Sequence, residues 1–151
     1  MAAIQIGLSN PKYSLPLSNS TTVVSTKVET DYLKKELIVE TIETPQPIKG
    51  NHSFAYGHCT SYVAKKRGGL PWSGNASKWL YNAPKYNYEV GQDAVVGAIL
   101  VTNESGYGHV AYVESVGDNN FVVSEMNYSG FNQISFRTIA KNSKFIKGFI
   151  L

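Results

Sequence analysis

The sequence predicts an α+β fold, in which short helices precede an antiparallel β-sheet. Two observations support this class. Helix-like segments bounded by Gly and Pro occupy residues 57–84, and short β-rich runs separated by Gly, Asn, Asp and Ser follow from residue 98 onward. The chain has 151 residues, of which 42% are hydrophobic. It is therefore long enough to bury a substantial core.

The first helix is expected over Thr60 to Lys66. Gly57 ends the segment before it, and the apolar side chains of residues 62–64 would face the core. A second short helix should open at residues 74–77, run from Lys78 to Ala83 and stop at Pro84, because proline cannot continue a helical interior.

Five strands are expected after these helices, arranged as a meander. They cover residues 98–101, 110–116, 121–126, 134–139 and 145–151.

Composition changes near Gly50. Residues 9–30 are rich in Ser, Thr and Asn, and Pro45-Gln46-Pro47 reads as an extended hinge. Residues 1–50 are therefore expected to form a tail or linker, partly extended, and residues 51–151 the folded domain. Within the tail, residues 32–42 are compatible with either an amphipathic helix or a strand.

Charge and hydropathy argue against two classes of partner, nucleic acids and membranes. A net charge of +3 with scattered basic residues falls short of a nucleic-acid-binding stripe, and Lys65-Lys66-Arg67 complements the end of the first helix. No apolar run approaches the roughly 20 residues that cross a bilayer, so no membrane insertion is expected. The first residues also lack the basic and apolar regions of a secretory signal peptide.

Cys59 is the only cysteine, so it has no disulfide partner within the chain. Such a residue is either a small buried hydrophobe or a reactive thiol. Its expected place in the first turn of a helix favours reactivity, because the free N–H groups and the helix dipole stabilise a thiolate. The same N–H groups can stabilise an oxyanion.

Three histidines could act as the base for this thiol. His58 is adjacent in sequence, and neighbouring helical side chains point about 100° apart. His52 lies near the hinge. His109 follows a Gly-rich loop and opens a strand, which is a suitable position for a general base at the edge of a cleft.

The next strand offers a group that could orient His109. Glu125 and Asn127 are two residues apart and therefore share one face. A hairpin loop of two or four residues would pair His109 with Tyr128 and send Glu125 to the opposite face. A three-residue loop over residues 117–119 would instead pair His109 with Asn127 and bring Glu125 within reach of the imidazole.

These segments together resemble the CHAP domain, the cysteine, histidine-dependent amidohydrolase/peptidase family. The similarity runs over about residues 52–151. It rests on the motifs Tyr-Gly-x-Cys-Thr-x-Tyr-Val-Ala at 56–64, Leu-Pro-Trp at 70–72, Gly-Asn-Ala at 74–76 with Trp79, Val-Gly-Ala-Ile at 96–99, Gly-His-Val-Ala-Tyr-Val-Glu at 108–114 and Ser-Glu-Met-Asn-Tyr at 124–128. The chain departs from the family at His58 and Ser61, where Gln or Asn and Trp are frequent.

The resemblance implies a papain-like fold with Cys59 as nucleophile, His109 as base, Glu125 as the orienting group and Asn127 as further polar support. It also implies hydrolysis of peptidoglycan, as a muramoyl-alanine amidase or a peptide endopeptidase. The alternative is a catalytically silent wall-binding or phage virion module with the same fold.

Tyr107, Trp72 and Tyr128 are candidates to line the substrate groove, with a role in the core as the alternative. Some relatives bind calcium just before the cysteine, but residues 44–58 here contain no Asp or Glu, so neither a metal nor a cofactor is expected. The expected partner is bacterial peptidoglycan, with phage virion proteins or a wall-binding domain as further candidates. The expected location is the cell wall, reached by a secreted or phage-associated protein.

Overall fold

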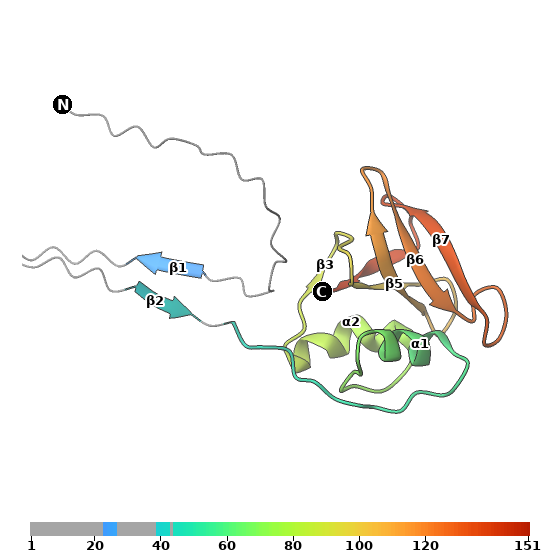
Figure 1. The fold of residues 1–151 in the computed structure, drawn as a ribbon, viewed down its shortest axis with the longest axis horizontal. Helices are drawn as coiled ribbons and strands as arrows, with labels where there is room; N and C mark the ends of the chain where they lie inside the picture. The colour runs from blue at the N-terminus through green and yellow to red at the C-terminus, as the bar shows by residue number, and fades with distance from the viewer. Residues whose placement is uncertain (1–22, 27–38, 43) are drawn as a thin grey trace, which may run out of the picture. The chain divides into compact units, whose positions relative to one another are not determined.

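The computed structural model describes residues 23–26, 39–42 and 44–151. The chain divides into two compact units, residues 1–44 and 45–151 (Figure 1). In the first unit, β1 (Val23–Thr26) pairs antiparallel with β2 (Val39–Ile42). The sequence left residues 32–42 open between a helix and a strand. Residues 39–42 form a strand, and residues 32–38 lie outside the described residues.

The second unit is α+β, as predicted, with short helices followed by strands. The helical elements are α1 (Cys59–Lys66), η1 (Ala76–Lys78), α2 (Trp79–Asn82) and η2 (Ala83–Tyr86). The strands are β3 (Val90–Gly91), β4 (Ile99–Thr102), β5 (His109–Val116), β6 (Asn120–Met126), β7 (Ile134–Ala140) and β8 (Ile146–Ile150). The sequence analysis missed only the two-residue strand β3 among these.

The strands form an antiparallel sheet in the order β3-β8-β4-β5-β6-β7. Strands β4 to β7 are neighbours in chain order, as the expected meander requires, but β8 returns to lie between β3 and β4. The meander was thus wrong for the last strand. The physical reason is burial: residues 148–150 of β8 are all buried, and a strand apolar on both faces is better accommodated inside a sheet than at its edge.

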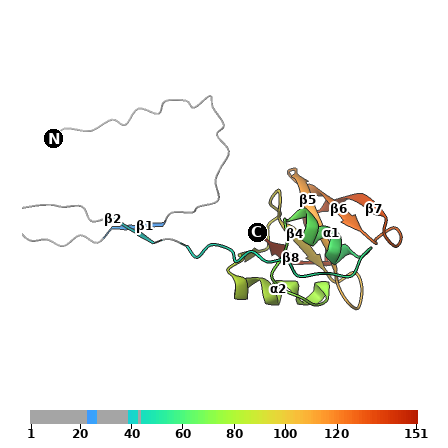
Figure 2. The same ribbon diagram turned by 60° about the horizontal axis from the view of Figure 1, so that its bottom comes forward.

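Two apolar clusters hold this unit together. The first lies between the helices and one face of the sheet, and includes Val63 of α1, Trp79 of α2 and Val110 of β5. The second is built from buried residues in and next to β4, β5, β6, β7 and β8. In Figure 2, α1 lies close to the sheet, where it contacts β5 and β6.

Pro84 does not stop the second helix as expected. The chain continues through a 3₁₀ turn, η2, in which Pro84 lies near the start. A proline is tolerated there because the first N–H groups of a helical turn have no intrahelical partner. The turn ends at Asn87, whose φ of 63° is left-handed.

Candidate active site

Cys59 is the first residue of α1. His58 before it is extended, with φ −100° and ψ 158°, and Gly57 has a φ of 79°. This sharp change of direction starts the helix at Cys59 and turns the free N–H groups of its first turn toward the thiol. The Cys59 side chain is partly buried and packs against the first apolar cluster.

Burial would raise the pKa of the Cys59 thiol, but its interactions outweigh this effect and lower the pKa below the usual value. They are a hydrogen bond to His109, the charge of that imidazole, and the backbone N–H groups of Val110 and Thr60. The arrangement therefore favours a thiolate.

His109 opens β5, as predicted. Its position depends on Gly108, which has a φ of 75° and approaches Ser77 so closely that a Cβ would lie 2.6 Å from the Ser77 nitrogen. His109 is only 7% exposed. Burial would lower the pKa of its imidazole, yet hydrogen bonds to Cys59 and Glu125 and their charges raise it to about 9. Cys59 and His109 thus favour a thiolate–imidazolium ion pair.

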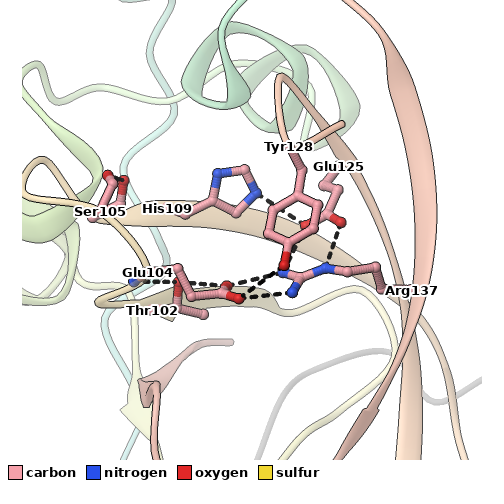
Figure 3. Close-up of polar contacts among 8 residues, drawn as sticks. Thr102, Glu104, Ser105, His109, Glu125, Tyr128 and Arg137 are labelled. Carbon is pink, nitrogen blue, oxygen red and sulfur yellow. Dashed lines mark hydrogen bonds and ion pairs between the residues drawn. The ribbon is translucent and has the colours of Figure 1, made fainter. Parts of the chain in front are cut away.

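Glu125 of β6 contacts the imidazole, as expected. The Nε2 atom of His109 lies 3.0 Å from the Oε2 atom of Glu125, and Figure 3 shows the ring turned toward this carboxylate. The Glu125 side chain is fully buried. Because Nε2 faces Glu125, the other ring nitrogen, Nδ1, is left to meet the thiol.

The hairpin loop that leads to this contact differs from the expected one. The N–H of Gly117 donates to the carbonyl of Asn120 at 2.8 Å, and Val116 pairs with Phe121, so the expected three-residue loop is wrong. This hairpin alone would direct Glu125 away from His109.

A β-bulge at Glu114 corrects the register. The pairing shifts between Val113 and Ser115, and beyond the bulge Val113 lies opposite Val123. Continued to the site, this register brings His109 opposite Asn127 and Glu125 one diagonal away. The bulged Glu114 forms an ion pair with Lys66 at the end of α1, which links the bulge to the helix that carries Cys59.

Arg137 and Glu104, which the sequence analysis missed, extend the polar cluster. Arg137 of β7 donates from Nε to Oε1 of Glu125 at 2.6 Å and from Nη2 to Oε2 at 3.0 Å (Figure 3). Its Nη1 and Nη2 atoms donate to the two carboxylate oxygens of Glu104 at 2.7 and 2.9 Å. Arg137 lies opposite Val123 and therefore shares a face with Glu125, a signal available only once strand pairing is known.

A cleft of about 430 Å³ lies beside the thiol. It is lined by His52, Ser53, Phe54, Ala55, His58, Cys59, Thr60, Gly74, Asn75, Ala76, Tyr107 and Gly108. Tyr107 is 73% exposed, consistent with its expected place at the groove. Among the described residues, this cleft thus brings together the Cys59 thiol and the start of α1, with the imidazole that is hydrogen-bonded to the thiol behind them.

Residues 49–127 of the chain match the CHAP domain, a span that includes Cys59, His109 and Glu125. The chain belongs to the CHAP domain family. The papain-like fold expected from the resemblance is confirmed by a solved relative, a crystal structure of an N-acetylmuramoyl-L-alanine amidase from Staphylococcus aureus. It is 33% identical, with a TM-score of 0.56, over 63% of this chain and 30% of that one.

Two curated proteins of Staphylococcus aureus strain NCTC 8325 are also similar. The probable autolysin LDP is 45% identical over 98 residues, which is 61% of this chain and 35% of that protein. The secretory antigen SsaA is 45% identical over 97 residues, which is 62% of this chain and 38% of that protein. The chain therefore spans little more than a third of the length of these relatives.

Within this CHAP domain, two of the aromatic residues expected at the groove have other positions. Trp72 is 2% exposed and packs against Trp79 and Tyr88 in the core, so its assignment to the groove was wrong. The reason is its position between two segments that cover the sheet, where a large apolar ring fills the interior. The ring centroid of Tyr128 lies 3.6 Å from the guanidinium carbon of Arg137, and the same ring packs beside His109. Tyr128 is not among the residues that line the cleft.

Asn127 also has a different contact from the one expected. It has a left-handed φ of 62°, which turns it out of the strand direction, and its Nδ2 atom lies 3.4 Å from Nδ1 of His58. The resemblance to the CHAP domain implied that Asn127 gives further polar support to the site, but the described contact of this amide is with His58. Asn127 thus contacts a residue that lines the cleft, His58, without lining the cleft itself.

Proposed function

We propose that residues 51–151 are a peptidoglycan hydrolase domain that cleaves an amide bond of the bacterial cell wall. The observation that carries this proposal is the contact of Cys59, at a helix N-terminus in an open cleft, with His109, which is held by a buried carboxylate. Two of the relatives, a probable autolysin and an N-acetylmuramoyl-L-alanine amidase, support the choice of substrate.

In the proposed reaction, the Cys59 thiolate attacks the amide carbonyl carbon and forms a tetrahedral intermediate. Backbone N–H groups at the start of α1, including that of Cys59, stabilise the oxyanion. The His109 imidazolium protonates the leaving amine as the C–N bond breaks, which leaves a thioester. Water, deprotonated by His109, then attacks the thioester, releasing a carboxylic acid and regenerating the thiol.

Glu125 acts in this scheme through His109. Its carboxylate accepts the Nε2–H of the imidazole, so the ring keeps one orientation and its Nδ1 atom remains directed to the thiol. The negative charge also stabilises the imidazolium that the first step requires. Tyr107, exposed at the rim, is proposed to contact the sugar or peptide part of the polymer.

The hydrolysed bond would be either the amide bond between muramic acid and alanine or a peptide bond of the stem or bridge peptide. We place the activity at the cell wall, in a secreted or phage-associated protein, with residues 1–50 as a tail or linker. The name of one relative, a secretory antigen, agrees with an extracellular location.

Mass spectrometry of fragments released from several purified bacterial walls tests this function. The expected result is a set of soluble muropeptides carrying the new carboxyl and amino ends of one hydrolysed amide, which identifies the bond. Binding to walls without any released fragment would instead indicate a catalytically silent wall-binding module.

Activity is expected to be lost on thiol alkylation and retained in the presence of a chelator. The reaction uses a thiolate, and the described residues contain no group of three or more His, Cys, Asp or Glu side chains that could hold a metal. The measurement is the rate of muropeptide release after treatment with iodoacetamide or with EDTA. Inhibition by EDTA that calcium reverses would contradict the expectation.

A further inference from the structure

We propose that Arg137 and Glu104 are positioning residues for the reaction: Arg137 keeps Glu125 ionised and oriented toward His109, and Glu104 keeps Arg137 in place. This inference deepens the proposed function and rests on it for the catalytic consequence. The contacts that suggest it are those of one guanidinium held between two carboxylates (Figure 3).

The first step of the argument is the burial of Glu125. A fully buried carboxylate is costly to ionise unless charged or hydrogen-bonding groups compensate for the lost water. Burial would raise the pKa of Glu125, but hydrogen bonds from His109 and Arg137 and their positive charges bring it below its usual value. Without Arg137, Glu125 would depend on His109 alone.

The second step is geometry. Both oxygens of Glu125 accept from Arg137, so the plane of the carboxylate is fixed as well as its charge. Oε2, one of these oxygens, is also the atom that meets the imidazole at 3.0 Å. The guanidinium therefore determines the direction in which Glu125 presents its acceptor to His109.

The third step concerns what holds Arg137. Glu104 binds the other side of the guanidinium with both oxygens, and Thr102 donates to Glu104 at 3.0 Å. Tyr128 stacks on the guanidinium and contacts Glu104 at 3.4 Å through its hydroxyl. Burial would raise the pKa of Glu104, but Arg137 lowers it. Both carboxylates are therefore charged, and their fork-like contacts leave Arg137 little freedom.

The resulting charges alternate in sign from the nucleophile outward. The titratable groups that act on His109 are Cys59 from α1, Glu125 from β6 and Glu104 from the loop after β4, with Tyr128 beside the ring. Arg137 from β7 lies between the two carboxylates. Each charge stabilises the neighbouring charge of opposite sign. Removal of Arg137 or Glu104 therefore changes the stability of the ion pair between Cys59 and His109.

Glu104 also connects this series to the cleft. It lies in the loop between β4 and β5, and the same loop carries Tyr107 and Gly108, which line the cleft. Arg137 thereby joins β7 to the loop that forms one edge of the proposed substrate site.

The test is the pH dependence of Cys59 alkylation by iodoacetamide, followed by intact mass, in Arg137→Met, Arg137→Lys and Glu104→Gln. Loss of Arg137 should weaken the imidazolium and thus raise the pH at which the thiolate forms. For Arg137→Met we expect a rise of about one pH unit, or about tenfold slower alkylation under mildly acidic conditions. Arg137→Lys and Glu104→Gln should shift the profile less, in the same direction, because part of the interaction remains.

Arg67→Met is the matched control. Arg67 donates to the backbone carbonyls of Gly97 and Leu151 and is not in contact with the Glu125 cluster, so its loss should lower thermal stability without moving the alkylation profile. If Arg137→Met and Glu104→Gln lower stability but keep the wild-type profile, the two residues are structural only and the inference is wrong. If Arg137→Met does not fold, Arg137→Lys and Glu104→Gln decide the question.

Alkylation requires no wall polymer, which separates this inference from the proposed function. A shifted profile in variants of a protein that releases no muropeptides would support the positioning role and refute the hydrolase. An unshifted profile in variants of an active hydrolase would refute the positioning role alone.

Discussion

Replacing Cys59 by alanine is expected to abolish the release of muropeptides from susceptible walls while leaving the thermal unfolding transition nearly unchanged. The thiol is the nucleophile that attacks the amide in the proposed reaction, and removal of such a group typically lowers kcat by several orders of magnitude, here on the order of 10⁴-fold or more. The side chain is small and only partly buried, so its loss removes little packing. Turbidity clearance and circular dichroism measure the two effects.

Cys59→Ser tests the same point with a closer replacement, because a hydroxyl retains the shape but does not ionise near neutral pH. It should be as inactive as the alanine variant. His52→Ala is the control. His52 also lines the cleft, and this variant should keep most of the activity, which would show that a substitution in the cleft does not by itself abolish hydrolysis. Substantial lysis by Cys59→Ala would refute the cysteine mechanism.

The local features around Cys59 were predictable from sequence because they depend on short-range rules. Gly57 with its left-handed φ and the apolar pattern of the next residues place the start of α1 to within one residue of its observed position. His109 at the start of β5 was predictable for the same reason: a Gly-rich loop ended and a β-rich run began.

The contacts of Glu125 needed more than local rules. Its reach to His109 depends on a bulge at Glu114, and nothing in a period-two pattern indicates where one extra residue enters a strand. Because the bulge at Glu114 compensates for a hairpin loop that differs from the expected one, the expected pairing at the site still arises. Arg137 was missed for a related reason, since its contact with Glu125 depends on the pairing of β6 with β7.

Trp72 shows the limit of assigning aromatic residues by composition. Both a groove and a core favour large rings, and only the packing of Trp72 against Trp79 and Tyr88 distinguishes them. The position of β8 is a comparable case, because its apolar residues favour an interior strand but do not determine which strands lie on either side of it.

Replacing His109 by glutamine is expected to reduce muropeptide release almost as much as loss of the thiol, on the order of 10³-fold or more. Glutamine can still contact Glu125 but can neither form the ion pair nor transfer the proton. The imidazolium lowers the pKa of Cys59, so its removal raises that pKa. As the pH falls, the variant should therefore lose its thiolate at a higher pH than the wild-type protein does.

His58→Gln provides the same substitution in a second histidine of the cleft. His58 contacts Asn127 at the cleft edge, and His109 rather than His58 is the imidazole hydrogen-bonded to the thiol, so this variant should retain most activity and the wild-type alkylation profile. Rates of muropeptide release and of iodoacetamide modification, measured side by side across the pH range, distinguish the two histidines. An equal loss in His58→Gln would mean that His58 supports the thiolate or the oxyanion directly, because a residue confined to the cleft edge has no other route to the reacting atoms.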